Sequence, residues 1–194
     1  MVSTPITSIF DAAKWFLTIA EEEGTYLSPL KLNCLLYLSQ AYYAAAKPGM
    51  KLMPAHFVAH DLGPVDPNLY RVMEQRNLNI FYEKITGEAL LLVKGIWKKY
   101  GKIAGDDLVN LLKSQLPYRK SYSVKIRNNE IPLSLMAEFY GSEKNSGKRK
   151  KTTEDIIKEG GGQNGARKNS LRRSQNGIIE VKKWTPKKEG VKNG

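Results

Sequence analysis

LSPLKLNCLLYLSQAYY, residues 27–43, is the stretch that decides the fold. Ser28 suits the N-cap of a helix because its hydroxyl can accept a hydrogen bond from a free backbone N–H. Pro29 suits the first helical position because that position needs no bonded N–H. Leucines and tyrosines follow mostly at three- and four-residue spacing, and residues 36–38 widen the apolar stripe until little polar face remains. The sequence therefore predicts a central, largely buried helix.

A second informative stretch, HDLGPVDPNLY, occupies residues 60–70. Asp66 followed by Pro67 repeats the arrangement of a capping side chain before a proline, which predicts a new helix from about residue 67 to residue 75. Gly63 and Pro64 are typical of a tight turn. The segment is therefore expected to be a turn that leads into a helix.

The remaining sequence up to residue 141 alternates helical patterns with helix breakers. Ser8 or Asp11 could cap a first helix, Gly24 could end it, and Pro117 is expected to end the fifth. Together with the two helices above, the expected helices cover residues 8–23, 88–100, 105–112 and 132–140, and a short extended segment covers 52–60. The predicted fold of residues 1–141 is mainly α: a compact bundle of about six helices with at most a short strand or hairpin.

Charge separates this domain from the residues that follow it. Residues 1–141 contain 16 Lys and Arg against 13 Asp and Glu, net +3, whereas residues 142–194 contain 15 against 6, net +9. The second part is rich in Lys, Arg, Gly, Asn and Ser, so it cannot bury enough apolar surface to offset ~1 to 2 kcal/mol of backbone entropy per residue. We therefore expect residues 142–194 to form a disordered basic tail.

Catalytic and metal-binding motifs are not found in the sequence. His56 and His60 have the spacing of metal ligands on a helix, but Pro54 and Gly63 argue against a helix there. The single cysteine, Cys34, lies in the apolar helix and is expected to be a small buried hydrophobe. The sequence has no G-x-S-x-G, P-loop, G-x-G-x-x-G or deaminase signature. We therefore predict that the protein is not an enzyme and uses no metal or cofactor.

The compartment follows from two further observations on the sequence. One cysteine cannot form an internal disulfide, which suits a reducing cytoplasm. No apolar run approaches the roughly 18 residues of a membrane span, and the first residues carry no basic segment of a signal peptide. We expect a cytoplasmic protein that does not bind membranes.

Taken together, the two informative stretches resemble the Panacea domain, also called the SocA-like antitoxin or phage-associated domain. Members carry a TPLKLQKLLYYAQ-like helix and a YGPV-x-P-x-LY turn, where this chain has SPLKLNCLLYLSQ and DLGPVDPNLY. The resemblance extends over residues 10–140, with Leu62 in place of the usual aromatic residue and Cys34 in place of a common lysine. It implies a mainly helical, bacterial protein that binds and neutralises a cognate toxin.

The resemblance also implies partners and a surface for them. In one branch of the family the antitoxin is an adaptor that presents the toxin to a protease, although no protease-docking motif can be identified in this chain. Tyr37 and Tyr43 lie beside the main apolar stripe of the central helix, so we expect their rings to face a partner groove. The expected partner-binding residues are Lys31, Tyr37, Asp61, Gly63, Pro64, Asp66 and Tyr70.

The basic tail supports an alternative hypothesis of a different class. Its clusters can neutralise phosphates and also have the composition of nuclear-import signals. The protein would then be a nucleic-acid-associated regulator, or a secreted bacterial effector directed to a host nucleus. The residues expected to act in this way are Lys148, Arg149, Lys150, Lys151, Arg167, Lys168, Arg172 and Arg173.

Overall fold

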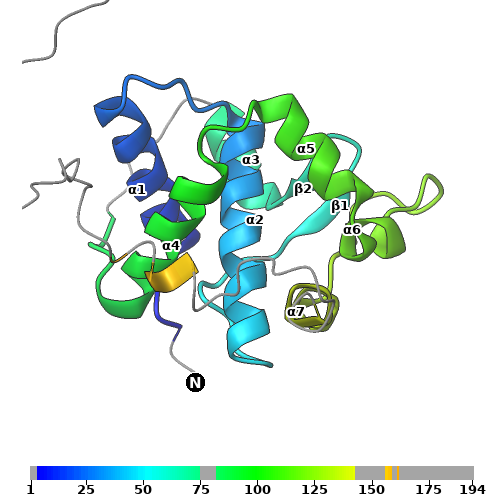
Figure 1. Ribbon diagram of the computed structural model, residues 1–194. Helices are drawn as coiled ribbons and strands as arrows, with labels where there is room; N and C mark the ends of the chain where they lie inside the picture. Colours follow the sequence, from blue (N-terminus) through cyan, green and yellow to red (C-terminus); the bar gives the residue numbers. More distant parts are fainter. Residues whose placement is uncertain (1–3, 75–81, 143–155, 159–160, 162–194) are drawn as a thin grey trace, which may run out of the picture. The chain divides into compact units, whose positions relative to one another are not determined.

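A computed structural model describes residues 4–74, 82–142, 156–158 and 161 (Figure 1). The chain divides into two units, residues 1–162 and 163–194, and every described residue belongs to the first. Helices dominate the first unit and are accompanied by a small three-stranded sheet, which confirms the predicted mainly α fold. Within this described part, no helix is both long and apolar enough to cross a membrane.

The central helix of the first unit is α2, Pro29–Ala46. It begins as predicted, because the Ser28 hydroxyl accepts a hydrogen bond from the Lys31 N–H at 3.3 Å. Its residues are buried without interruption from Lys31 to Ala44, since α1, α4, α5 and α7 pack around it (Figure 1). A helix enclosed on all sides needs apolar side chains almost all round, and this sequence provides them.

The first helix, α1, spans Ile9–Glu22 and begins with a capping box. The Ser8 hydroxyl accepts a hydrogen bond from the Phe10 N–H at 3.2 Å, and the Asp11 carboxylate accepts one from the Ser8 N–H at 2.8 Å. Of the two caps that the sequence left open, Ser8 is therefore the N-cap and Asp11 its reciprocal partner.

Five further helices follow α2, and one of them was not expected. Pro117 was interpreted as a helix end, but it lies in the first turn of a short helix, where its missing N–H costs no helical hydrogen bond. Residues 4–74 and 82–142 therefore form seven helices, close to the predicted number of about six. The five are α3 (Pro67–Glu74), α4 (Gly87–Tyr100), α5 (Gly105–Ser114), α6 (Leu116–Ser121) and α7 (Leu133–Ser142).

The sheet has the order β2-β1-β3, and both pairings are antiparallel. Its strands are β1 (Val58–His60), β2 (Gly63–Val65) and β3 (Asn129–Glu130). The expected turn at Gly63-Pro64 is wrong, because the turn lies at residues 61–62 and Gly63 already pairs with His60. Gly63 has a φ of 123°, and a Cβ there would lie 3.3 Å from Val109 on α5. Glycine adopts this backbone without strain, and a larger residue would also press against Val109.

One short piece of the sequence beyond residue 141 packs against α4. Residues 156–158 form a helical turn, shown in orange beside α4 in Figure 1. Ile156 is fully buried, and a Cβ at Gly95 would overlap the Ile156 backbone. Gly95 therefore allows the two segments to approach closely. Nearly all of the expected tail lies outside the described residues, so its disorder and its boundary at residue 141 remain predictions.

Candidate functional site

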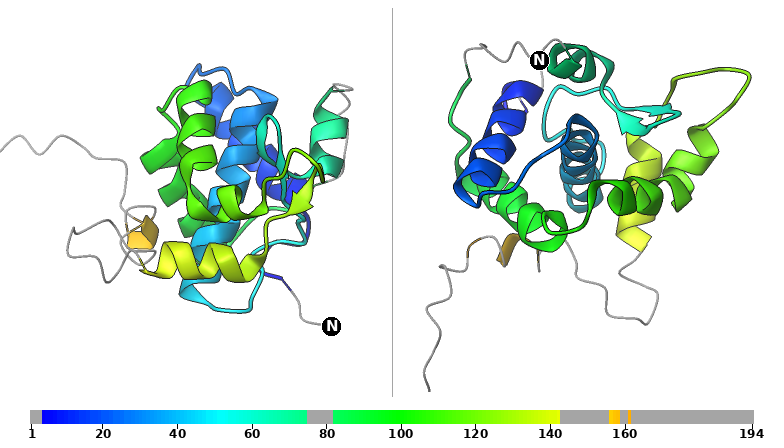
Figure 2. Two further views of the ribbon diagram at one scale, coloured as in Figure 1. Left: turned by 90° about the vertical axis from the view of Figure 1, so that its right-hand side faces the viewer. Right: turned by 90° about the horizontal axis from the view of Figure 1, so that it is seen from above.

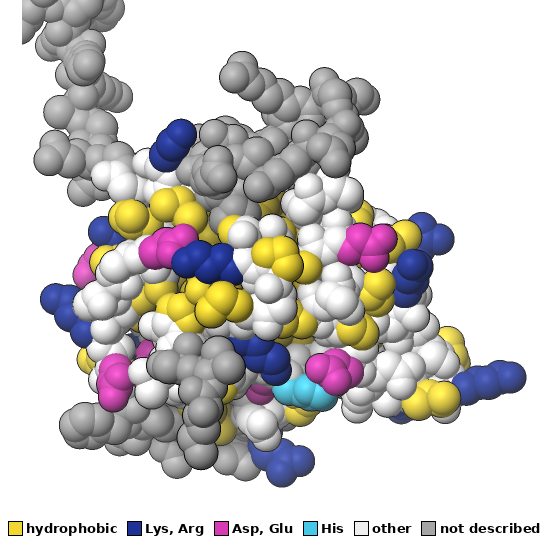
Figure 3. Space-filling model, turned by 90° about the horizontal axis from the view of Figure 1, so that it is seen from below, with side chains coloured by type: hydrophobic (Ala, Val, Ile, Leu, Met, Phe, Trp, Pro, Cys, Tyr) yellow, Lys and Arg dark blue, Asp and Glu magenta, His cyan; other side chains and the backbone are white. Residues whose placement is uncertain are grey.

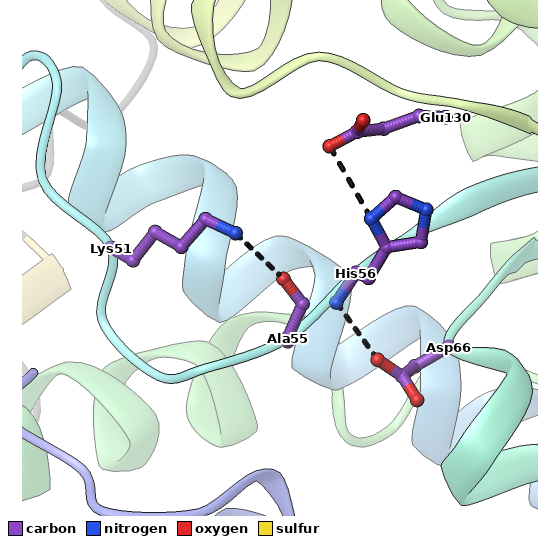
Figure 4. Close-up of polar contacts among 5 residues, drawn as sticks. All are labelled: Lys51, Ala55, His56, Asp66 and Glu130. Carbon is purple, nitrogen blue, oxygen red and sulfur yellow. Dashed lines mark hydrogen bonds and ion pairs between the residues drawn. The ribbon is translucent and has the colours of Figure 1, made fainter.

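A buried polar junction joins α2 to the start of α3. The Asn33 side-chain oxygen accepts a hydrogen bond from the Asp66 N–H at 2.9 Å. The Asp66 carboxylate accepts from the N–H groups of Asn68 and Leu69, both at 3.1 Å, and from the His56 N–H at 2.8 Å (Figure 4). Asp66 therefore caps α3, as predicted, and also fixes the chain before β1. The two stretches singled out in the sequence meet in space through these bonds.

The exposed counterpart of this junction is the hairpin tip, residues 60–62, which comprises the last residue of β1 and the turn that leads to β2. Two side chains from the neighbouring α5–α6 region hold the backbone and side chain of Asp61. Lys113 Nζ donates to the Asp61 carbonyl at 2.9 Å, and the Tyr122 hydroxyl donates to Asp61 Oδ1 at 2.9 Å. Figure 2 shows the hairpin beside these helices, and α5 contacts β2 while α6 contacts β1. The tip is thus fixed from outside its own strands.

A third side chain, Tyr118, completes the support. Its hydroxyl donates to the His60 carbonyl at 2.6 Å, and its ring stacks on Tyr122 with the centroids 5.5 Å apart. Burial, followed by the nearby Tyr122 and Asp61, raises the pKa of Tyr118 to about 12. The hydrogen bond to Asp61 is the main cause that raises the pKa of Tyr122. Both hydroxyls therefore remain protonated donors at neutral pH.

Several groups at the tip remain accessible to another molecule. Asp61 is exposed, and the Leu62 side chain is 41% exposed. His60 Nδ1 accepts a hydrogen bond from the Leu62 N–H at 3.1 Å, and the His60 ring lies 6.2 Å from the half-buried Tyr70 ring. The tip therefore offers a carboxylate, an aliphatic side chain and two rings on a supported backbone.

The seven expected partner-binding residues divide between this surface and the interior. Asp61 is exposed and Tyr70 is half-buried. The other five are buried, so they can shape a partner surface only from beneath: Lys31, Tyr37, Gly63, Pro64 and Asp66. Whether the accessible members bind a partner remains a prediction.

The expectation for the two tyrosines of α2, Tyr37 and Tyr43, requires a correction. Tyr37 is 1% exposed and packs edge to face on Phe57, and burial raises its pKa. Tyr43 is 3% exposed. The expectation that these rings face a partner groove is wrong, because helices and the sheet surround α2 and leave no open face beside its main stripe.

Lys31 also lies inside, and its role is structural. Its Nζ donates to the Gly101 carbonyl at 2.6 Å, which ties the start of α2 to the end of α4. Burial lowers the pKa of Lys31. The ammonium group satisfies a carbonyl at a helix C-terminus, where a positive charge is favourable.

The two histidines lie in different surroundings. His56 Nδ1 is 3.4 Å from Glu130 Oε1 (Figure 4), whereas His60 lies beside Tyr70. No group of three or more His, Cys, Asp or Glu side chains able to hold a metal ion occurs within the described ranges. Cys34 is buried, as expected, and burial raises the pKa of its thiol to about 12.

A small pocket lies between α2, the sheet and α7. Its volume is about 10 Å³, and Gln40, Lys51 and Glu130 contribute to its lining. Gln40 Oε1 accepts hydrogen bonds from two backbone N–H groups, while its buried Nε2 has no acceptor among the described residues. A pocket of this size has room for about one water molecule and not for a substrate.

Sequence reasoning missed the residues that support the hairpin tip. Lys113, Tyr118 and Tyr122 lie 52 to 61 residues from the groups they bind, so no local pattern connects them.

The eight basic residues expected to contact nucleic acid lie outside the described residues. Comparison of the chain with protein-family models, curated proteins and solved structures gave no match.

Proposed function

We propose that this chain is a non-enzymatic, antitoxin-like protein of the bacterial cytoplasm that binds and neutralises a cognate toxin. The proposal rests on the resemblance of the two sequence stretches to SocA-like antitoxins. The structural observation that carries it is the hairpin tip, where Asp61 and Leu62 are accessible while Lys113, Tyr118 and Tyr122 hold their backbone.

A supported tip is suited to binding a protein. Ordering a loop when a complex forms costs conformational entropy, and a loop that is already held in place avoids much of that cost. An aliphatic side chain next to a carboxylate can provide both apolar contact and selectivity for a complementary charge. The buried Asp66 junction adds to this effect, because it fixes the position of β2 against α2.

The decisive experiment is neutralisation in living cells. A reading frame adjacent to this one is expressed alone and then with this protein, and growth is measured. We expect growth arrest that co-expression relieves. Leu62→Arg should abolish the rescue by placing a charge in the interface, whereas Tyr26→Arg, at a residue 82% exposed between α1 and α2, should not.

The outcomes separate the function from the site. A neighbour without toxicity, or toxicity that co-expression does not relieve, rejects the antitoxin proposal. Rescue that survives Leu62→Arg rejects the hairpin tip as the binding site. If the toxin is also presented to a protease, co-expression should shorten the half-life of the toxin, and direct neutralisation should leave that half-life unchanged.

The charge of residues 142–194 favours nucleic-acid binding as a second candidate function. Net +9 over these residues predicts nonspecific binding that weakens steeply with salt. The test compares DNA binding of the full chain with that of a variant in which the eight basic residues named above become glutamine. Substitution is preferable to truncation at residue 141, because Ile156 packs against α4. DNA binding that survives in the variant would exclude these eight residues as its cause.

A further inference from the structure

The small net charge of the domain hides an uneven distribution. Between Asp107 and Glu130 the chain carries five basic residues and no acidic one. The remaining positions of residues 1–141 carry 11 Lys and Arg against 13 Asp and Glu, so they are net −2. The positive charge of the domain is therefore concentrated in the end of α5, in α6 and in the segment that follows α6. The five basic residues are Lys113, Arg119, Lys120, Lys125 and Arg127.

Most of this charge is exposed and lies next to exposed apolar side chains. We call residues 122–128, between α6 and β3, the arm. Its Val124 and Ile126 are 76% and 64% exposed, and they alternate in sequence with the exposed Lys125 and Arg127. The arm projects at the right of Figure 1, and basic and hydrophobic side chains occur together at the same side in Figure 3.

The arm is attached at both ends. At its start, the Tyr122 hydroxyl is bonded to Asp61 of the hairpin tip. At its end, Asn129 pairs with Ala59 through β3, and the Asn129 amide donates to the Ser121 carbonyl at 3.1 Å. These contacts anchor both ends of the arm and make it continuous with the hairpin tip.

We propose that the arm and α6 are the docking surface for an acidic segment of a partner protein that also presents apolar side chains. This inference rests on the proposed toxin-binding function and specifies the chemistry of the partner. Lys125, Arg127 and the two α6 cations attract carboxylates, and Val124 and Ile126 gain contacts with apolar groups. Apolar side chains exposed to this extent beside a supported charged surface are typical of protein interfaces.

A nucleic acid would use this surface less completely. Phosphates would pair with the cations but would leave Val124 and Ile126 in water. Base stacking needs an accessible aromatic face, whereas Tyr118 is buried and stacks on Tyr122. The exposed aliphatic residues therefore favour an acidic and apolar protein segment over DNA or RNA.

The proposal is tested by fluorescence anisotropy with the full chain and four probes. Three are short labelled peptides: one alternates Glu with Leu, one alternates Glu with Ser, and one alternates Lys with Leu. The fourth is a short DNA duplex. The Glu-Leu peptide should bind most tightly, and its affinity should fall between about 50 and about 200 mM salt. The Glu-Ser peptide measures the purely electrostatic binding that the basic tail also provides.

Two double variants locate the binding. Lys125→Glu/Arg127→Glu should weaken binding of the Glu-Leu peptide at least about tenfold, because the charges are reversed. The matched control, Lys84→Glu/Lys102→Glu, makes the same change in net charge at two exposed residues outside the arm and should have a small effect. Val124→Ser/Ile126→Ser should weaken binding of the Glu-Leu peptide roughly fivefold and leave the affinity for the Glu-Ser peptide unchanged.

Three results would overturn the proposal. One is a loss of Glu-Leu affinity that is as large in the Lys84→Glu/Lys102→Glu control as in Lys125→Glu/Arg127→Glu. Another is a Glu-Leu affinity that the serine variant does not change. The third is a DNA affinity that depends on Lys125 and Arg127 as strongly as the peptide affinity does. The toxin-rescue assay separates the two ideas, because rescue by the wild type that both arm variants retain rejects the arm and leaves the proposed function standing.

Discussion

Residues 28–43 and residues 60–70 carry the same local signal but have different positions in the structure. Each contains a capping side chain followed by a proline at a helix start. The first segment is buried almost throughout, whereas the second begins at the exposed hairpin tip, passes through the buried Asp66 junction and continues into α3. A helix-start motif therefore fixes the local conformation of the chain but not its exposure to solvent.

The difference in exposure arises from the neighbours of each segment. Five helices and strand β2 pack against α2, so even residues outside its main apolar stripe are enclosed. Side chains from α5, α6 and the residue after α6 hold the hairpin tip, and the His60 ring also lies beside Tyr70 of α3. Asp61 and Leu62 nevertheless remain exposed. Candidate binding residues should therefore be sought at the tip rather than on α2.

The largest effect is expected inside the first segment. Tyr37→Ala should lower the free energy of unfolding by about 3 to 5 kcal/mol, because it empties a site that is 1% exposed. Tyr26→Ala, at a residue 82% exposed, should change it by less than about 0.5 kcal/mol. Urea denaturation of both variants measures the contrast. Similar losses in the two variants would show that Tyr37 is not enclosed.

A smaller effect is expected within the second segment, between the buried Asp66 and the exposed Asp61. Asp66→Ala should cost about 2 to 3 kcal/mol of unfolding free energy, because it removes the cap of α3 and leaves the His56 N–H without its acceptor. Asp61→Ala should cost about 1 kcal/mol or less, because Tyr122 can donate to water instead. Equal losses of unfolding free energy would mean that Asp66 contributes no more to stability than Asp61 does.

The smallest effect concerns the support of the hairpin tip and depends on pH. Tyr118→Phe removes the bond to the His60 carbonyl and should cost about 1 kcal/mol at neutral pH. The pKa of Tyr118 is raised in the folded state, to about 12, so its contribution is complete below its ordinary pKa of about 10 and is lost as pH rises from 10 to 12.

The stability deficit of Tyr118→Phe relative to the wild type should therefore shrink over this pH range. Other groups with raised pKa values, including Cys34 and Tyr122, remain in both proteins and cancel in the difference. Denaturation at several alkaline pH values measures the deficit, and Tyr26→Phe is the exposed control. A deficit that stays constant up to pH 12 would contradict the assignment.

The sequence predicted most of the fold correctly because the relevant signals are local. Ser28 and Asp66 cap helices where expected, and the apolar pattern of residues 30–43 correctly predicts a buried central helix. The errors arose where two local structures were both compatible with the residues. Pro117 can end a helix or begin one, and Gly63 can form a turn or the first residue of a strand after it.

The candidate site was less predictable. Of the expected partner-binding residues, Asp61 is exposed and Tyr70 is half-buried, whereas Lys31 and Tyr37 are buried. The supporting residues Lys113, Tyr118 and Tyr122 come from a distant part of the chain. The arm was also overlooked, because summing charge over the whole domain cancelled its basic residues against acidic residues elsewhere.

By itself, the sequence determined the helical fold, the main helix starts and the concentration of charge after residue 141, since these depend on neighbouring residues and on composition. Only the tertiary structure decided which of the two helix-start segments lies at the surface. That outcome depends on how many other elements pack around each segment, and packing brings together residues that are far apart in the chain. For the same reason, only the structure joined the hairpin tip to the arm, through the bond between Asp61 and Tyr122.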